Sequence, residues 1–383
     1  MHLREHAFVS GNLEGELQLG TVSQDVIEAI LGKIHEPAQI RSLGRMMAAN
    51  DDHEQQGKEC VDRAETLMTA ARALGLGNEA MRGELGTVVK INRAQLSDAA
   101  FESFLLLLRG QCFPKLEEVD LPFCTIRGTK VESFSDAILQ GGLASCTELN
   151  LSFNNINDAD MQLFSNAVQS GSLPNLKKLV LTQNKIGNAG MTALVGAIRT
   201  GESLANLETL DLDLNQIGDD GIKVFSTAIS SGALPLLREL YLYSNAIGNA
   251  GVTALADAIA SGALANCQYL HLEGNQISDP GMVSFSDAIA GGGIASLRQL
   301  WLMQNRIGDA GMIAFANAVR SRSMVNLGIL RLDGNLIGDA GLVALADAVR
   351  SEALPSLQTV STRGNPGDAE VLREALRGLI VLA

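Results

Sequence analysis

One pattern of apolar and polar positions recurs along most of this 383-residue chain. Leucines are spaced as LxxLxLxxN, and the next asparagine follows 30 residues later, or 31 residues later across the one longer unit that contains residues 200–203. The asparagines of this pattern are Asn154, Asn184, Asn215, Asn245, Asn275, Asn305, Asn335 and Asn365. Leucines two apart share one face of a strand, so each LxL predicts a short β-strand with its leucines in the core.

A second pattern follows each asparagine. The motif I-G-(D/N)-A-G leads into apolar residues at helical spacing, as in Met191, Leu194, Ala197 and Ile198, which predicts an α-helix with one buried face. We expect the asparagine side chain to bind main-chain groups where the chain leaves the strand. We expect the Asp or Asn of the second motif to be the N-cap of the helix. These residues are Asp158, Asn188, Asp219, Asn249, Asp279, Asp309 and Asp339.

The repeats continue towards both ends in a less regular form. Cys124 stands at the asparagine position of one unit, and a degenerate unit surrounds Val89, Ile91 and Leu96. With these, about ten units of about 30 residues occupy residues 85–383. The last unit is irregular, and its segment 370–382 predicts an apolar helix that covers the C-terminal end of the core.

These units resemble the leucine-rich repeats of the ribonuclease-inhibitor type, in which each strand is followed by a full α-helix. The resemblance covers about three quarters of the chain, and the motif positions recur in register from unit to unit. It implies an α/β leucine-rich-repeat solenoid in the form of a horseshoe. Strands stack about 4.8 Å apart whereas packed helices need about 10 Å, so the helix side fans outward and the strand side becomes concave.

Residues 1–84 do not follow the repeat, and we interpret them as a helical cap on the first unit. Apolar residues at helical spacing predict helices within 26–34, 40–46 and 61–71, with a polar loop over 50–58. The stretch 22–47 also resembles a degenerate F-box, a short helical module that docks a scaffold of ubiquitin ligases. An apolar helix, a break at Pro37 and a second apolar helix come in that order, although the Leu-Pro opening and the late Trp of that module are absent.

Composition and charge narrow the class of protein. Hydrophobic residues make up 46% of the chain, enough for a large core. The net charge of −14 argues against nucleic acid as the partner. No apolar run approaches the ~20 residues that cross a bilayer, so we expect no membrane association. Five cysteines, an odd number in a long chain, favour a reducing compartment over a disulfide framework. We therefore expect a cytoplasmic protein, with the nucleus as an alternative.

Side chains on the predicted concave face are free of core packing, so their identity reports on function. All three tyrosines of the chain and its single tryptophan fall on three adjacent strands of this face. The cluster consists of Tyr241, Tyr243, Tyr269, His271, Trp301 and Met303. Aromatic clusters surrounded by charge are typical of protein-binding hot spots, although tyrosine and tryptophan also favour strands in general. We interpret the cluster as a partner-binding site.

Charged residues surround this cluster. They are Asp211, Asp213, Glu239, Glu273, Arg331 and Asp333. We expect Glu239, Glu273 and Asp333 at its rim. Acids outnumber bases over the whole face, which predicts a partner with a basic surface, although a solvated charged face has the same composition.

Motifs of catalysis and cofactor binding do not occur in this sequence. The repeats contain a single histidine, His271, so no Ser-His-Asp or Cys-His set can form within them. Zinc motifs such as CxxC and HExxH and the phosphate-binding GxxxxGK[ST] are missing. His271 and Glu273 lie two apart on one strand face and could share a proton or one metal ion, but we expect them to form a solvated surface pair. The sequence predicts no enzyme, no cofactor and no metal.

The pattern as a whole predicts a noncatalytic module that binds another protein on the concave face. Two alternatives stay open. The repeats also resemble those of the GTPase-activating protein of Ran, which implies regulation of a small GTPase; that family carries an acidic C-terminal tail, whereas this sequence ends in LIVLA. The F-box resemblance implies a substrate-recognition adaptor of a ubiquitin ligase. The partner and the oligomeric state are not predicted.

Overall fold

The computed structural model describes residues 37–48, 54–76, 90–92, 96–199, 204–375 and 380–382. The chain divides into two compact units. Unit 1 comprises residues 1–120 and 136–146, and unit 2 comprises residues 121–135 and 147–383. The predicted helix within 26–34 and the longer repeat segment 200–203 lie outside the described residues.

Unit 1 contains the described part of the N-terminal segment. Helices α3 (Pro37–Ala48) and α4 (Glu54–Ala73) confirm two of its three predicted helices. They pack against each other, and α4 also packs against α6 (Asp98–Arg109). The predicted loop over 50–58 is wrong from Glu54 onward, because Glu, Gln and Lys favour the first turns of α4. Of the stretch 22–47, residues 37–47 belong to α3 and the rest lies outside the described residues.

Strands begin at every position where the LxL pattern predicts one. Their bounds are β1 Lys90–Asn92, β2 Glu118–Asp120, β3 Glu148–Asn150, β4 Lys178–Val180, β5 Thr209–Asp211, β6 Glu239–Tyr241, β7 Tyr269–His271, β8 Gln299–Trp301, β9 Ile329–Arg331, β10 Thr359–Ser361 and β11 Ile380–Leu382. Strand β1 pairs with β2 in parallel, and β3 to β11 pair in parallel in chain order.

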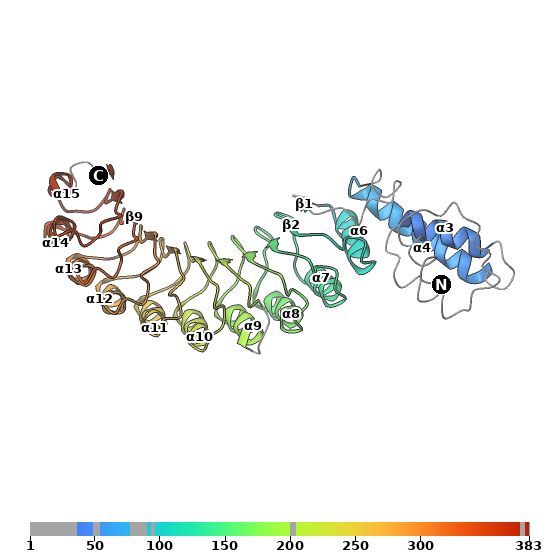
Figure 1. Cartoon of the computed structure of the whole chain (residues 1–383), viewed down its shortest axis with the longest axis horizontal. Coiled ribbons are helices and arrows are strands. Elements are labelled where there is room, and N and C mark those ends of the chain that lie inside the picture. Colours follow the sequence, from blue (N-terminus) through green and yellow to red (C-terminus); the bar gives the residue numbers. More distant parts are fainter. Residues whose placement is uncertain are drawn as a thin grey trace, which may run out of the picture. The chain divides into compact units, whose positions relative to one another are not determined.

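A helix follows each strand from β2 to β10. The bounds are α7 Thr129–Leu139, α8 Asp158–Gln169, α9 Asn188–Arg199, α10 Asp219–Ser230, α11 Asn249–Ala260, α12 Asp279–Ala290, α13 Asp309–Val319, α14 Asp339–Arg350 and α15 Glu370–Ala375. Within unit 2, Figure 1 shows helices α8 to α14 along the outer side of an arc whose inner side is lined by the strands. We call this inner side the concave face.

The core of unit 2 lies between its strands and its helices. The central leucine of each strand from β3 to β9 is at most 1% exposed, and helix residues such as Phe225, Phe285 and Phe315 are equally buried. Each such side chain contributes about 1.5–3 kcal/mol by leaving water. The LxL leucines therefore lie where the sequence pattern predicts them.

The repeating asparagines join successive units, as predicted from their position after the strand. Asn275 Nδ2 donates to the main-chain oxygens of Leu242 (2.9 Å) and Leu272 (3.1 Å), while its Oδ1 accepts from the amide of Ile247 (3.1 Å). Leu242 and Ile247 belong to the preceding unit. Cys124, which takes the asparagine position of its own unit, is also buried, and its Sγ donates to the carbonyl oxygen of Pro122.

The Asp or Asn of the second motif is not the N-cap, so that prediction is wrong. It is the first residue of the helix, and the residue before it is the N-cap, as Gly308 is for α13. Its side chain serves the next unit instead. Asp279 Oδ1 accepts from the amides of Gly308 (2.6 Å) and Gly311 (3.0 Å) at the start of α13. The acceptor that an N-cap glycine lacks is thus supplied by the preceding repeat.

This contact explains a glycine of the motif. A Cβ atom on Gly311 would lie 2.8 Å from Asp279 Oδ1 and 2.9 Å from the Cβ atom of Met282. No side chain fits between the carboxylate and the amide that it binds, so the second glycine of I-G-(D/N)-A-G is required for close approach of the two units.

The C-terminal segment departs from its predicted structure. Residues 370–382 are not one helix, because α15 ends at Ala375 and Ile380–Leu382 forms β11 beside β10. Branched residues in I-V-L favour a strand, and pairing supplies backbone partners to the otherwise open edge of β10.

Candidate functional site

The residues predicted for the site lie on strands β5 to β9 or two positions beyond them. On β6 the central Leu240 is buried, whereas Glu239 and Tyr241 on the other side of the strand are half-buried. The same alternation places Tyr269 and His271 of β7 on the concave face. The predicted face is therefore confirmed as the one opposite the leucine core.

An aromatic row crosses four neighbouring strands of this face. The ring of Tyr241 meets His271 edge-on, with centroids 4.6 Å apart and planes at 87°. His271 stacks on Trp301, with centroids 4.0 Å apart and planes at 12°. The guanidinium carbon of Arg331 lies 4.6 Å from the centre of the Trp301 ring. Each aromatic pair contributes about 0.5–1.5 kcal/mol beyond its buried area. We call Tyr241, His271, Trp301 and Arg331 the aromatic row.

The row remains on the surface rather than inside the core. All four of its residues keep part of their surface exposed, although only 12% of the His271 side chain is exposed. Three of its polar atoms, His271 Nε2, Trp301 Nε1 and Arg331 Nε, are covered and have no hydrogen-bond partner among the described residues. A covered polar atom without a partner costs free energy, so the row is not optimised for stability alone.

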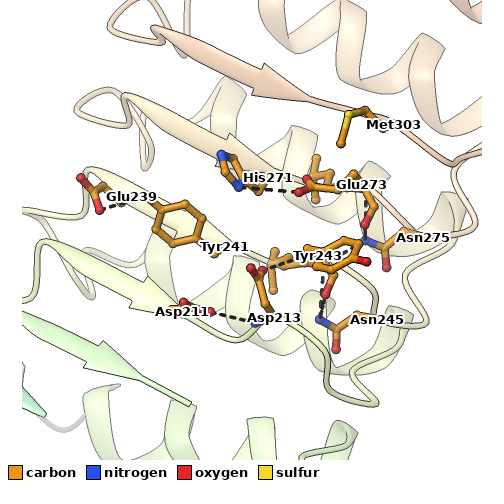
Figure 2. Close-up of polar contacts among 12 residues, drawn as sticks. Asp211, Asp213, Glu239, Tyr241, Tyr243, Asn245, His271, Glu273, Asn275 and Met303 are labelled. Atoms are coloured by element: carbon orange, nitrogen blue, oxygen red, sulfur yellow. Dashed lines mark hydrogen bonds and ion pairs between the residues drawn. The ribbon is translucent and has the colours of Figure 1, made fainter. Parts of the chain in front are cut away.

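Glu239 is held beside the row by two hydroxyl groups. Its Oε2 accepts hydrogen bonds from Thr209 Oγ1 (2.9 Å) and from the hydroxyl of Tyr241 (3.1 Å). Figure 2 shows Glu239 and Tyr241 on their strand. Burial and the neighbouring carboxylate raise the pKa of Tyr241 above its ordinary value, so the phenol stays protonated and donates. Thr209 was not predicted as part of the site.

A second group of polar residues follows the ends of β5 and β6. Asp211 Oδ1 accepts from the amide of Asp213 (3.0 Å), and Asp213 Oδ1 accepts from the amide of Tyr243 (2.7 Å). Burial and the nearby Asp211 raise the pKa of Asp213 to about 7, although the amide of Tyr243 opposes the shift. This carboxyl therefore changes charge near neutral pH.

Glu273 does not lie at the rim, so its predicted place is wrong. Only 6% of its side chain is exposed, and its Oε2 has no hydrogen-bond partner among the described residues. Figure 2 shows it with His271, Tyr243 and Met303 around it. Burial raises the pKa of Glu273 to about 7. A hydrogen bond from its own main-chain amide and the charge of Arg331 oppose the shift, whereas Asp213 adds to it.

His271 and Glu273 are not a solvated surface pair either. Burial, helped by Arg331, lowers the pKa of His271 to about 4, so the imidazole is neutral at neutral pH. Its Nδ1 lies 3.7 Å from Glu273 Oε1, too far for a good hydrogen bond. The two side chains are therefore neighbours that do not share a hydrogen bond of good geometry.

The other predicted residues lie around these groups. The ring of Tyr243 packs on Gly274, where a Cβ atom would approach its Cε2 to 3.0 Å. Asp333 Oδ1 accepts from Ser361 Oγ and from the amide of Arg363. Tyr269 and Met303 are half-buried.

A further aromatic pair was not predicted. Phe123 and Phe153 are 48% and 37% exposed and stack with ring centroids 4.3 Å apart. Both directly precede the asparagine position of their units, where other units carry Gln183 or Ser244. That change of residue type within the repeat is the signal that could have revealed the pair.

Among the residues described, no group of three His, Cys, Asp or Glu side chains is placed to hold a metal ion. Over the same residues, none of the helices has the length and apolarity to cross a membrane.

Comparison with known proteins agrees with the fold. The family model described as "Leucine Rich repeat" matches residues 147–165, 172–195, 203–226, 233–256, 268–286, 294–316 and 324–346. This part of the chain is therefore built of leucine-rich repeats, and the fold is a leucine-rich-repeat solenoid of strand–helix units. No curated protein matches the chain.

Two solved structures are similar at low sequence identity. An internalin of Listeria monocytogenes is 16% identical, covering 83% of this chain and 94% of its own, with a TM-score of 0.38. A TDR receptor is 17% identical, covering 66% of this chain and 44% of its own, with a TM-score of 0.34.

Proposed function

We propose that this protein is a noncatalytic protein-interaction module that holds a partner protein on the concave face of unit 2. The partner would contact the aromatic row together with Tyr243, Tyr269 and Met303. The acidic side chains Asp211, Asp213, Glu239, Glu273 and Asp333 favour a partner with a basic surface.

The aromatic row is the observation that supports this proposal. Tyr241, His271 and Trp301 form one continuous row, and the rings hold each other in place through the contacts at 4.6 and 4.0 Å. A rigid aromatic surface binds without losing much side-chain entropy, which is why hot spots are rich in tyrosine, tryptophan and arginine.

Affinity capture with matched variants tests the proposal. Proteins captured by the wild-type chain are compared with those captured by Tyr241→Ala, Trp301→Ala and Phe123→Ala, where Phe123 is the exposed aromatic control away from the row. We expect the two row variants to lose a captured protein that Phe123→Ala retains, with an affinity loss of about 2 kcal/mol or more. Retention by the row variants and loss by Phe123→Ala would place the binding surface elsewhere.

We further propose a subtype, a domain division and a compartment for the protein. The full helices of 11 or 12 residues in the units of α7 to α14 support the ribonuclease-inhibitor-like subtype. The packing of α4 on α6 supports a cap over residues 1–84 and a repeat domain over residues 85–383. The five cysteines are buried as thiols, which supports a reducing compartment such as the cytoplasm.

A further inference from the structure

Three carboxyl groups lie together where strands β5 and β7 end. We define the acid patch as Asp211, Asp213 and Glu273, with the ring of Tyr243 beside them. Figure 2 shows Asp213, Tyr243 and Glu273 following one another across the ends of β5, β6 and β7. We infer that the acid patch binds the guanidinium group of an arginine that the partner protein presents to the concave face. This inference rests on the proposed function and specifies the partner's chemistry.

Two acids on the strands, Glu118 and Glu148, pair with a lysine of a neighbouring strand, whereas the acid patch has no such ion pair among the described residues. Glu118 of β2 pairs with Lys90 of β1, and Glu148 of β3 pairs with Lys178 of β4. Within the part of the chain that the structure describes, no lysine or arginine forms an ion pair with Asp211, Asp213 or Glu273. The cross-strand lysine that pairs with Glu118 and with Glu148 therefore has no counterpart at the acid patch among these residues.

Glu273 is an independent sign of a missing partner. Its side chain is 94% buried, since 6% is exposed, and its Oε2 accepts no hydrogen bond from any described residue. Native proteins seldom leave a buried carboxyl oxygen unsatisfied. Arg331 does not fill this role, because its guanidinium group lies over Trp301.

The chemistry of the acid patch fits arginine better than lysine. A guanidinium group is planar, stacks on aromatic rings and donates from several N–H groups at once, so it can lie on Tyr243 while it binds carboxylates on both sides. The aromatic row already contains one guanidinium group stacked on a ring, that of Arg331 on Trp301. An ammonium group is more strongly hydrated and gains less from such a site.

Binding is coupled to proton release. Asp213 faces Asp211, Glu273 and the amide of Tyr243, and Glu273 faces its own main-chain amide, His271, Asp213 and Arg331. The pKa values of Asp213 and Glu273 are both raised to about 7, and His271 is neutral at that pH. A guanidinium group favours the ionised carboxylates, so binding releases protons and becomes tighter between pH 6 and pH 8.

A tripeptide titration tests the arginine site directly on the full chain. The probe is an acetylated and amidated Gly-Arg-Gly peptide, and its control carries citrulline, the uncharged analogue of arginine. Trp301 is the only tryptophan of the chain, so its fluorescence reports on this face alone. Calorimetry in two buffers of different ionisation enthalpy measures the protons released. We expect the arginine peptide to bind with a Kd of about 1 mM at pH 8 and several-fold more weakly at pH 6.

Matched variants distinguish binding of the arginine peptide at the acid patch from its general attraction to an acidic protein. The double variant Asp213→Asn/Glu273→Gln is expected to weaken binding at least about tenfold. The control Glu118→Gln/Glu148→Gln removes the same number of charges from strand acids outside the acid patch and is expected to change the Kd less than about twofold. Equal binding of the citrulline peptide, or an equal loss in the control variant, would overturn the inference. Either result leaves the capture experiment with Trp301→Ala unaffected, so the two proposals fail separately.

Discussion

His271 and Trp301 lie face to face on neighbouring strands, with ring centroids 4.0 Å apart and planes within 12° of parallel. Tyr241 approaches His271 from the strand on its other side. Together these contacts leave 12% of the His271 side chain exposed. Burial therefore keeps the imidazole neutral, and it serves as a flat spacer between two aromatic rings.

The titration of His271 is the first prediction. Its imidazole is expected to take up a proton near pH 4, well below the ordinary value of 6.5, because burial and Arg331 both disfavour the cation. Arg331→Gln should raise the pKa of His271, yet not to 6.5, since burial is the larger cause and stays. NMR of the imidazole protons measures both values, with His271→Gln to assign the resonance. A midpoint near 6.5 in the wild-type protein would contradict the stacked arrangement.

The charge of Glu273 should limit stability at alkaline pH. Its pKa is about 7 in the folded protein and 4.5 ordinarily, so the folded state binds the extra proton between these values. The free energy of unfolding therefore falls as the pH rises through that window. Because glutamine does not ionise, Glu273→Gln should be about 1–3 kcal/mol more stable than wild type at pH 8 and nearly equal at pH 5.

Urea denaturation at the two pH values measures this difference. His271 contributes the opposite slope below pH 6.5, but it does so in both proteins and cancels in the comparison. The control is Glu148→Gln, an acid of β3 whose side chain is 51% exposed, expected within about 0.5 kcal/mol of wild type. A Glu273→Gln variant less stable than wild type at pH 8 would show that the buried carboxylate is favourable in the fold.

The contact between repeats at Asp279 gives a third prediction. Asp279→Ala removes the acceptor of the Gly308 and Gly311 amides, so we expect a loss of about 1–3 kcal/mol in the free energy of unfolding. Asp279→Asn should cost less than about 1 kcal/mol, because Asn249 makes the same contact one unit earlier. Asp287→Ala, on the exposed side of α12, is the control. Denaturant titration ranks the three variants, and an equal effect of the alanine and control variants would contradict the role of this contact.

The period of the sequence is enough to predict what every unit shares. Because residues 30 positions apart occupy equivalent places, the strand leucines and the main-chain contacts of Asn275 follow from the spacing alone. The choice of face follows in the same way, since alternation along a strand fixes which side chains, such as Tyr241, lie opposite the core.

Features that depend on the neighbouring unit could not be read from one repeat. Glu273 is buried because Tyr243 and Met303 of adjoining units lie beside it. The alternation of side chains along a strand predicts the face on which Glu273 lies but not these neighbours. The carboxylate of Asp279 accepts a hydrogen bond from the start of the next helix rather than from its own helix. The sequence motif alone does not distinguish this role from that of an N-cap. The strand at Ile380–Leu382 likewise forms only because β10 offers an open edge.

Tyr243 and Gly274 provide the last prediction. Gly274 has a left-handed backbone, with φ of +66°, and a Cβ atom there would lie 3.0 Å from Tyr243 Cε2. Backbone conformation alone does not require glycine, because Ser244 and Gln304 take φ of 50° and 53° at the equivalent positions. Gly334 has nearly the same φ, +65°, but its nearest neighbour, Gln304 Cγ, would be 3.5 Å from a Cβ atom. The ring of Tyr243 therefore distinguishes the two glycines.

We expect Gly274→Ala to lower the free energy of unfolding by about 2 kcal/mol and Gly334→Ala by about 1 kcal/mol, the ordinary cost of a left-handed alanine. In a Tyr243→Ala background the cost at Gly274 should fall to that at Gly334, giving an interaction energy of about 1 kcal/mol in a double-mutant cycle measured by urea denaturation. Equal costs at the two glycines in the wild-type background would mean that the backbone, and not the tyrosine ring, selects glycine after Glu273.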